Sequence, residues 1–145
     1  MQYKYIIIPL VTMMLAQLVK FLIETITTKK INLARLLNGN GGMPSSHTSL
    51  VTSLSTAIGI GYGFDSPLFA ICLVFSIIIA YDSMGLRMES GKQAVAINKL
   101  MEHNGIDDNI PLKEMLGHKP IEVLAGIIFG IVLAYIQMNI FSWLK

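Results

Sequence analysis

Long blocks of apolar residues, separated by short polar segments, constrain this chain more than any other feature. Of its 145 residues, 53% are hydrophobic and only 14% are charged. A helix rises ~1.5 Å per residue, so about 20 apolar residues cross the ~30 Å hydrocarbon core of a bilayer. The sequence therefore predicts an all-α, integral membrane helical bundle that forms one domain over residues 1–145, with about four transmembrane helices.

The expected spans are joined by polar connections of different lengths. The four segments are Tyr5–Thr27, His47–Tyr62, Pro67–Tyr81 and Ile121–Ile140. A tight turn over residues 61–67 makes the second and third spans an antiparallel hairpin. The long third connection carries a short amphipathic helix, Glu89–His103, and the first connection a short interfacial helix around Ile31–Leu37.

Charge and cysteine content limit the classes of partner. The net charge is only +2, and no basic cluster is interleaved with aromatic residues, so nucleic acid is not an expected partner. The single cysteine, Cys72, excludes a disulfide framework and a cysteine metal site. Four spans place both termini on one side, and most lysines and arginines lie in the connections on the other. The positive-inside rule then puts these connections in the cytoplasm, in a bacterial-type plasma membrane.

The first span carries polar residues on one helical face. Gln17, Lys20 and Glu24 are spaced by three and four residues. A lysine within a span usually faces the bundle interior or a polar cavity, which marks Lys20 as a functional candidate. The alternatives are an i,i+4 pair with Glu24, or a lysine that reaches the headgroups.

A glycine-rich loop leads into the second span with the sequence Gly-Asn-Gly-Gly-Met-Pro-Ser-Ser-His. Gly42 lets the backbone approach a ligand, and Pro44 suits the first helical turn. Ser45 or Ser46 is then the capping residue, with His47 in the first turn. Because a helix N-terminus attracts anions, the loop predicts a phosphate site with a proton donor. An ordinary helix-entry loop with a capping serine is the alternative.

Further titratable residues lie at membrane boundaries on the same side. These are His47, Asp82, Arg87 and His118. Glu122 follows His118 by four residues at a helix start, which places both on one face, where the carboxylate fixes the imidazole tautomer. The set fits phosphoryl transfer through a phosphohistidine. It also fits a metal site of His47, His118 and a carboxylate, or an interfacial ion pair of His118 and Glu122.

Two of these segments resemble motifs of a known superfamily. Pro44–His47 resembles the Pro-Ser-Gly-His motif of the type 2 phosphatidic acid phosphatases, which share an architecture with vanadium-dependent haloperoxidases. Gly117–Gly126 resembles their last motif, in which His-x-x-x-Asp is followed by Val-x-Ala-Gly. Nearly the whole chain resembles the small divergent branch of the superfamily, with Tyr81–Gly85 as a branch feature.

This resemblance implies roles for individual residues. The nucleophile would be His118, the acid that orients it Glu122, and the proton donor to the leaving alcohol His47. The expected phosphate-binding residues are Ser45, Ser46, Arg87, Lys20, Arg35 and Gly42, with Asp82 and Lys92 in support. The resemblance implies neither a metal nor a cofactor.

The chain also departs from the superfamily pattern. The first motif, Lys-x6-Arg-Pro, is absent, because Lys20 and Arg35 have the wrong spacing. Arg87 lies far upstream of His118, where relatives place the arginine close to the last motif. A serine replaces the motif glycine at Ser46, and Glu122 replaces aspartate. Since phosphoryl transfer depends on positioned charge, a weakened set of cations affects the rate more than binding.

Three functions remain in view. The first is a metal-independent phosphatase that hydrolyses a lipid phosphate or pyrophosphate through a phosphohistidine, with membrane lipids as surroundings. The second is a non-catalytic protein that binds or transports a lipid phosphate, and the third is a structural membrane subunit. A four-span bundle encloses little of a lipid tail, which raises the expectation of a homodimer. Use of Mg²⁺ by Asp82, Asp107 or Asp108 stays open.

Overall fold

The computed structural model describes residues 2–29, 31, 42–105, 111–112, 114 and 117–143, without the side chains of Leu86 and Arg87. Every regular element in these ranges is a helix, which confirms the predicted all-α class. The helices are α1 (Lys4–Thr28), α3 (Ser46–Tyr62), α4 (Pro67–Met84), α5 (Leu86–His103) and α6 (Pro120–Trp143).

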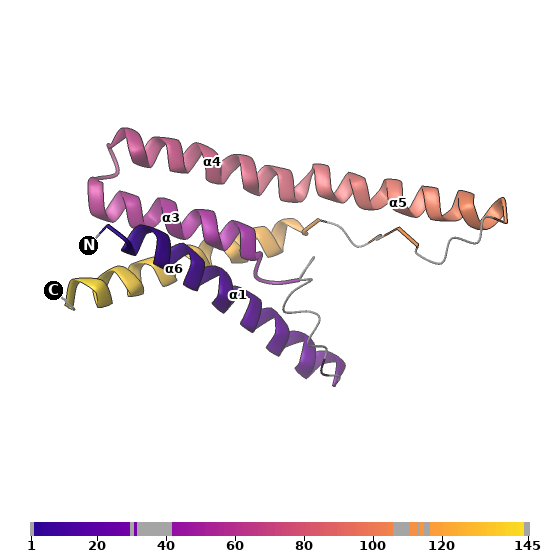
Figure 1. Ribbon diagram of the computed structural model, residues 1–145, viewed down its shortest axis with the longest axis horizontal. Coiled ribbons are helices and arrows are strands. Elements are labelled where there is room, and N and C mark those ends of the chain that lie inside the picture. Colours follow the sequence, from indigo (N-terminus) through magenta and orange to yellow (C-terminus); the bar gives the residue numbers. More distant parts are fainter. Residues whose placement is uncertain are drawn as a thin grey trace.

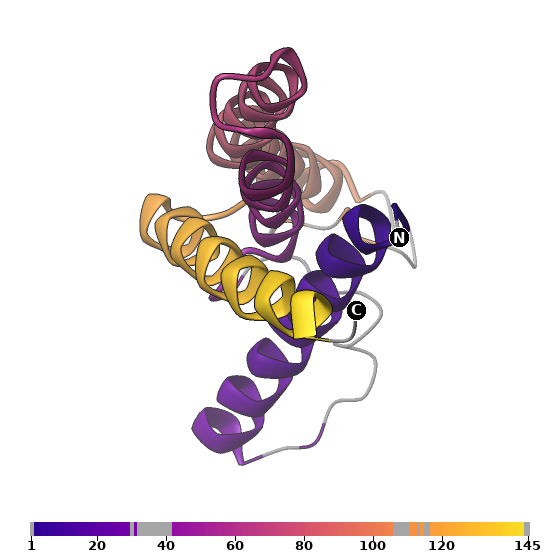
Figure 2. The ribbon, with the colours of Figure 1, turned by 90° about the vertical axis from the view of Figure 1, so that its left-hand side faces the viewer.

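Helices α1, α3, α4 and α6 form a bundle with α3 at its centre. Helix α3 packs against the other three, whereas α4 touches α6 only slightly (Figure 2). The termini lie at the same end of the bundle as the turn between α3 and α4 (Figure 1). The opposite end gathers the end of α4 and the starts of α3 and α6. This arrangement confirms the antiparallel hairpin and the placement of both termini on one side.

The exposed and buried side chains are distributed as expected for a membrane protein. Helix α4 buries only Ser76 and Ser83, while large apolar side chains such as Ile71, Val74 and Ile77 are exposed. Helix α3 likewise buries mostly small and hydroxyl-bearing residues. Lipid favours apolar side chains outside and small residues between helices, so this pattern indicates a bundle immersed in a bilayer.

The number of long apolar helices differs from the expected four. Three stretches of the described chain are long and apolar enough to cross a membrane: α1, α6, and α4 together with α5. Helix α3 has 17 residues. Its many hydroxyl groups make it less apolar than the other three, and these three surround it.

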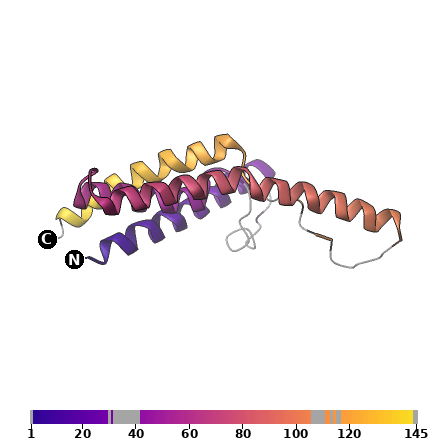
Figure 3. The same cartoon turned by 90° about the horizontal axis from the view of Figure 1, so that it is seen from above.

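The third connection also differs from expectation. We expected the third span to end at Tyr81 and a separate helix to begin at Glu89, but α4 continues to Met84 and α5 begins at Leu86. Figure 3 shows α4 and α5 as one nearly straight rod that extends beyond the bundle. No proline interrupts residues 68–103, so the helical hydrogen bonds continue with only a local break at Gly85. The helix expected around Ile31–Leu37 lies outside the described residues.

A stripe of small residues on α6 brings this helix against α3. Gly126, Gly130 and Ala134 are buried at intervals of four residues. A Cβ atom added to Gly126 would lie 2.8 Å from Ser45 O, and one added to Gly130 would lie 2.7 Å from Ser49 O. Small residues at this spacing allow the two backbones to touch, as in other membrane helix pairs.

The two ends of the bundle differ in polarity. The end near the termini holds an apolar cluster of Ile8, Ala57, Ala134 and Met138. The other end buries hydroxyl and charged groups, including Lys20 and Ser46. Burial of such groups is costly unless they are hydrogen-bonded or paired, so we expect the functional site at the polar end of the bundle.

Candidate functional site

Ser45 caps the N-terminus of α3. Its Oγ accepts hydrogen bonds from Thr48 N at 3.4 Å and from Thr48 Oγ1 at 3.0 Å. Capping by one of the two motif serines is thereby confirmed. Pro44 was expected in the first helical turn, but the helix begins at Ser46 and Pro44 lies before the cap. The proline ring fixes φ there without entering the helix.

Lys20 reaches the same helix start from α1. Its side chain is only 3% exposed, and Nζ donates a hydrogen bond to Ser46 Oγ at 3.1 Å. The expectation that this lysine faces the bundle interior is therefore confirmed. An ammonium group beside the positive end of the α3 dipole creates a positive potential, which favours an anion at this position.

The start of α6 is joined to this site by two backbone hydrogen bonds. Ser45 N donates to Glu122 O, and His118 N donates to Ser83 O at the end of α4, each at 3.0 Å. The His118 side chain is only 4% exposed. Helices α1, α3, α4 and α6 thus meet around Lys20, Ser45 and His118.

The relation between His118 and Glu122 differs from a helical i,i+4 pair. Helix α6 begins at Pro120, so His118 precedes it and the argument from helical spacing fails. Glu122 Oε2 accepts a hydrogen bond from Lys119 N at 3.1 Å. The carboxylate therefore turns back toward the residue that follows His118, as in the second half of a capping box.

The other sequence candidates have different positions. His47 is the second residue of α3 and is exposed, whereas Asp82 is half-buried near the end of α4. Gly42 has a φ of 84°, the left-handed conformation that suits glycine. Lys92 forms a 2.6 Å ion pair with Glu89 on the exposed surface of α5.

Two candidate cations are described only in part or not at all. The backbone of Arg87 lies in the first turn of α5, but its side chain is outside the described part of the chain. Arg35 lies outside the described residues altogether. The expected phosphate-binding roles of both arginines therefore stay predictions.

Sequence reasoning missed two residues that hold the site together. Thr48 donates to Ser45 Oγ, and the Ser83 carbonyl accepts from His118 N. Both side chains are fully buried. The signal for Thr48 was its place three residues after the cap, while Ser83 contributes through its backbone, which no side-chain pattern reveals.

The described residues contain no group of three or more histidine, cysteine, aspartate or glutamate side chains arranged to hold a metal ion. Of the aspartates considered for Mg²⁺, Asp107 and Asp108 lie outside the described residues. Among the described groups, the Lys20 ammonium and the N-terminus of α3 contribute positive potential to the site.

The sequence of the chain matches the model of a known protein family. The family model described as the Divergent PAP2 family matches residues 1–133. The chain belongs to this family. The family resemblance of the sequence is thus confirmed.

This divergent PAP2 protein is similar in sequence to the uncharacterized membrane protein YuiD of Bacillus subtilis (strain 168). The two sequences are 39% identical over 147 aligned positions, which cover 89% of this chain and 92% of the relative. No solved structure matches the chain. Together with the apolar helices, the relative supports a membrane location.

Proposed function

We propose that the protein is a membrane-embedded phosphatase that hydrolyses a lipid phosphate or pyrophosphate through a phosphohistidine. The observation that carries this proposal is the meeting of three features at one end of the bundle. The buried Lys20 ammonium donates to the first residue of α3, and the buried His118 lies on the segment that enters α6. A phosphate group at this place is attracted by the lysine and by the start of α3.

In the proposed reaction, a ring nitrogen of His118 attacks phosphorus while the bond to the leaving oxygen breaks. His47, in the first turn of α3, gives a proton to this oxygen. Water then attacks the phosphohistidine, the P–N bond breaks, and inorganic phosphate leaves as His118 is restored. Glu122 positions the histidine segment, because its carboxylate is bonded to Lys119 N.

A lipid substrate follows from the depth of the site. The proposed phosphate position lies near the starts of α3 and α6 and the end of α4, at one end of the membrane bundle. An amphiphile enters sideways from the bilayer with its headgroup at this level. We place the protein in a bacterial-type plasma membrane with the polar connections in the cytoplasm, and we include a homodimer among its assemblies.

A second candidate function is binding or transport of a lipid phosphate without hydrolysis. The hydrogen bond between Glu122 Oε2 and Lys119 N favours this function, because it gives the carboxylate a structural role at the start of α6. The missing first motif also favours it, since fewer positioned cations reduce the rate more than binding.

Phosphate release from purified protein separates the two functions. We expect inorganic phosphate from at least one lipid mono- or diphosphate in detergent, with EDTA present throughout. Absence of release, with EDTA or with added Mg²⁺, would contradict the phosphatase. Specific retention of a lipid phosphate by the same inactive sample would then support the second function, binding of a lipid phosphate without hydrolysis.

Replacement of Lys20 by methionine is expected to lower phosphate release by about 10²–10³-fold, the effect of losing one positioned donor to a transition-state oxygen. The side chain keeps a similar length, so the packing of α1 changes little. Initial rates with the preferred lipid measure the effect. Lys29→Met, an exposed lysine just after α1, is the matched control and should retain the wild-type rate. Full activity of Lys20→Met would contradict the role of Lys20 in binding the phosphate group.

A further inference from the structure

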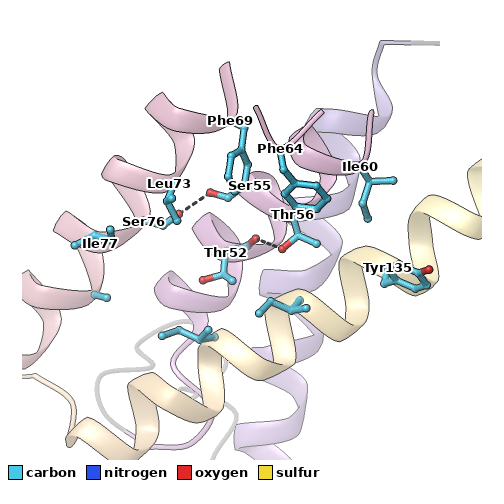
Figure 4. A pocket seen from close by; sticks show the side chains of 13 residues that line it. Thr52, Ser55, Thr56, Ile60, Phe64, Phe69, Leu73, Ser76, Ile77 and Tyr135 are labelled. Atoms are coloured by element: carbon cyan, nitrogen blue, oxygen red, sulfur yellow. Dashed lines mark hydrogen bonds between the residues drawn. The ribbon is translucent and has the colours of Figure 1, made fainter. Parts of the chain in front are cut away.

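A groove runs along the bundle between α3, α4 and α6. Its volume is about 430 Å³, within the range of sites that hold one small ligand. Figure 4 shows side chains of α3 and α4, together with Tyr135 of α6, facing into this space. The groove is separate from the Lys20 and His118 positions, and nothing in the proposed chemistry uses it.

The surface of the groove is hydrocarbon although hydroxyl residues line it. Thr56 Oγ1 donates to Thr52 O at 2.8 Å, and Ser55 Oγ donates to Val51 O at 3.0 Å. Ser76 Oγ lies 2.8 Å from Ser55 Oγ. These hydroxyl groups therefore bond to the helices themselves. None of the described side chains that line the groove is charged, so its occupant must be apolar.

One end of the groove adjoins the proposed phosphate site. Ala80 lines the groove, and its carbonyl accepts from Ser83 Oγ at 2.8 Å, in the same turn that holds His118 N. Ile127 lines the opposite wall and follows Gly126, which packs on Ser45. This end of the groove therefore lies within about one helical turn of the segments that carry Ser83 and Ser45.

The other end is closed by an aromatic pair. Phe64 and Phe69 meet edge to face with ring centroids 5.1 Å apart. Along α3, the lining runs from Thr52 to Ile60, a length of about 12 Å at ~1.5 Å per residue. On the open side, Ile77 and Ile131 are largely exposed, so the groove faces the surrounding lipid. Hydrocarbon chains are the material that fills such a space in a bilayer.

We propose that this groove binds one hydrocarbon chain of the same lipid whose phosphate occupies the site at Lys20 and His118. The inference rests on the proposed site, because the nearness of the groove to that site selects this chain over any other bilayer chain. The groove accepts the first part of the chain, next to the headgroup, and the remainder stays in the bilayer. Affinity should therefore rise with chain length and become constant once the groove is filled.

Photochemical labelling tests the groove without relying on turnover. The probe is a lipid phosphate with a diazirine in the part of one acyl chain nearest the headgroup, added to full-length His118→Ala protein in phosphatidylcholine vesicles. We expect labels on groove-lining residues of α3, α4 and α6, and competition by an unlabelled lipid phosphate. Labels spread over exposed positions such as Val74 and Val132 would overturn the inference, as would cross-links through the groove to a second copy.

Matched tryptophan substitutions sharpen this test. Leu73→Trp and Ile131→Trp place a large ring in the groove from exposed positions, and should reduce labelling several-fold. Val74→Trp and Val132→Trp are exposed neighbours outside the lining and should leave labelling unchanged. Equal labelling in both pairs of variants would contradict binding of the lipid chain in the groove.

The outcome for the groove is distinguishable from the outcome for the enzyme. Labelling within the groove, without phosphate release from wild-type protein, would support binding of the lipid chain in the groove and contradict the proposed phosphatase activity. Phosphate release with a KM that does not depend on chain length would support the phosphatase activity and contradict binding of the lipid chain in the groove.

Discussion

Replacement of His118 by alanine is expected to reduce phosphate release to the uncatalysed background while the bundle stays folded. The imidazole is the proposed nucleophile, and alanine leaves no group able to form the phosphoryl intermediate. The contacts that position the segment survive, because His118 N, not its ring, bonds to Ser83 O. Phosphate release in detergent measures the activity, and circular dichroism with size-exclusion chromatography measures the fold.

The chain provides a matched control in its remaining histidines. His103 ends α5 on an exposed surface, so His103→Ala should retain the wild-type rate. His47→Ala should lower the rate by about 10²–10⁴-fold, the usual contribution of a general acid. Trapping of radiolabelled phosphate on wild-type protein, and its absence from His118→Ala, would identify the intermediate. A wild-type rate in His118→Ala would contradict the mechanism.

The sequence predicted the helical class because apolar blocks and polar turns are local signals. The turn before Pro67 and the cap at Ser45 were visible for the same reason, since capping depends on residues adjacent in the chain. The pairing of the two motif segments was expected only through the family resemblance. The structure now brings them together by the bond from Ser45 N to Glu122 O.

Other features depended on tertiary contacts and could not be predicted. The hydrogen bond from Lys20 to Ser46 required the position of α3, which no local pattern in α1 indicates. The straight passage from α4 into α5 was missed because Asp82, Ser83 and Gly85 are typical of a helix end. The place of Glu122 depended on the first residue of α6, and a sequence pattern does not fix helix boundaries to the residue.

Replacement of Gly126 by valine is expected to damage both stability and activity. The new Cβ would lie 2.8 Å from Ser45 O and 3.1 Å from Thr48 Cβ, so α6 must move away from α3. Such overpacking costs about 1–3 kcal/mol of folding free energy. The same movement stretches the 3.0 Å bond from Ser45 N to Glu122 O, which holds the two motif segments together. Thermal unfolding in detergent and phosphate release measure the two effects.

A second glycine separates the effect on packing from the effect on the site. Gly130→Val meets Ser49 O at 2.7 Å, one helical turn farther from His118, and should lose similar stability but less activity. Ile128→Val changes an exposed position on the same helix and should alter neither measurement. Because Gly126 and Gly130 belong to one contact, equal activity losses in both would show that activity follows stability alone. A larger loss in Gly126→Val would show that the join between Ser45 and Glu122 positions the reacting groups.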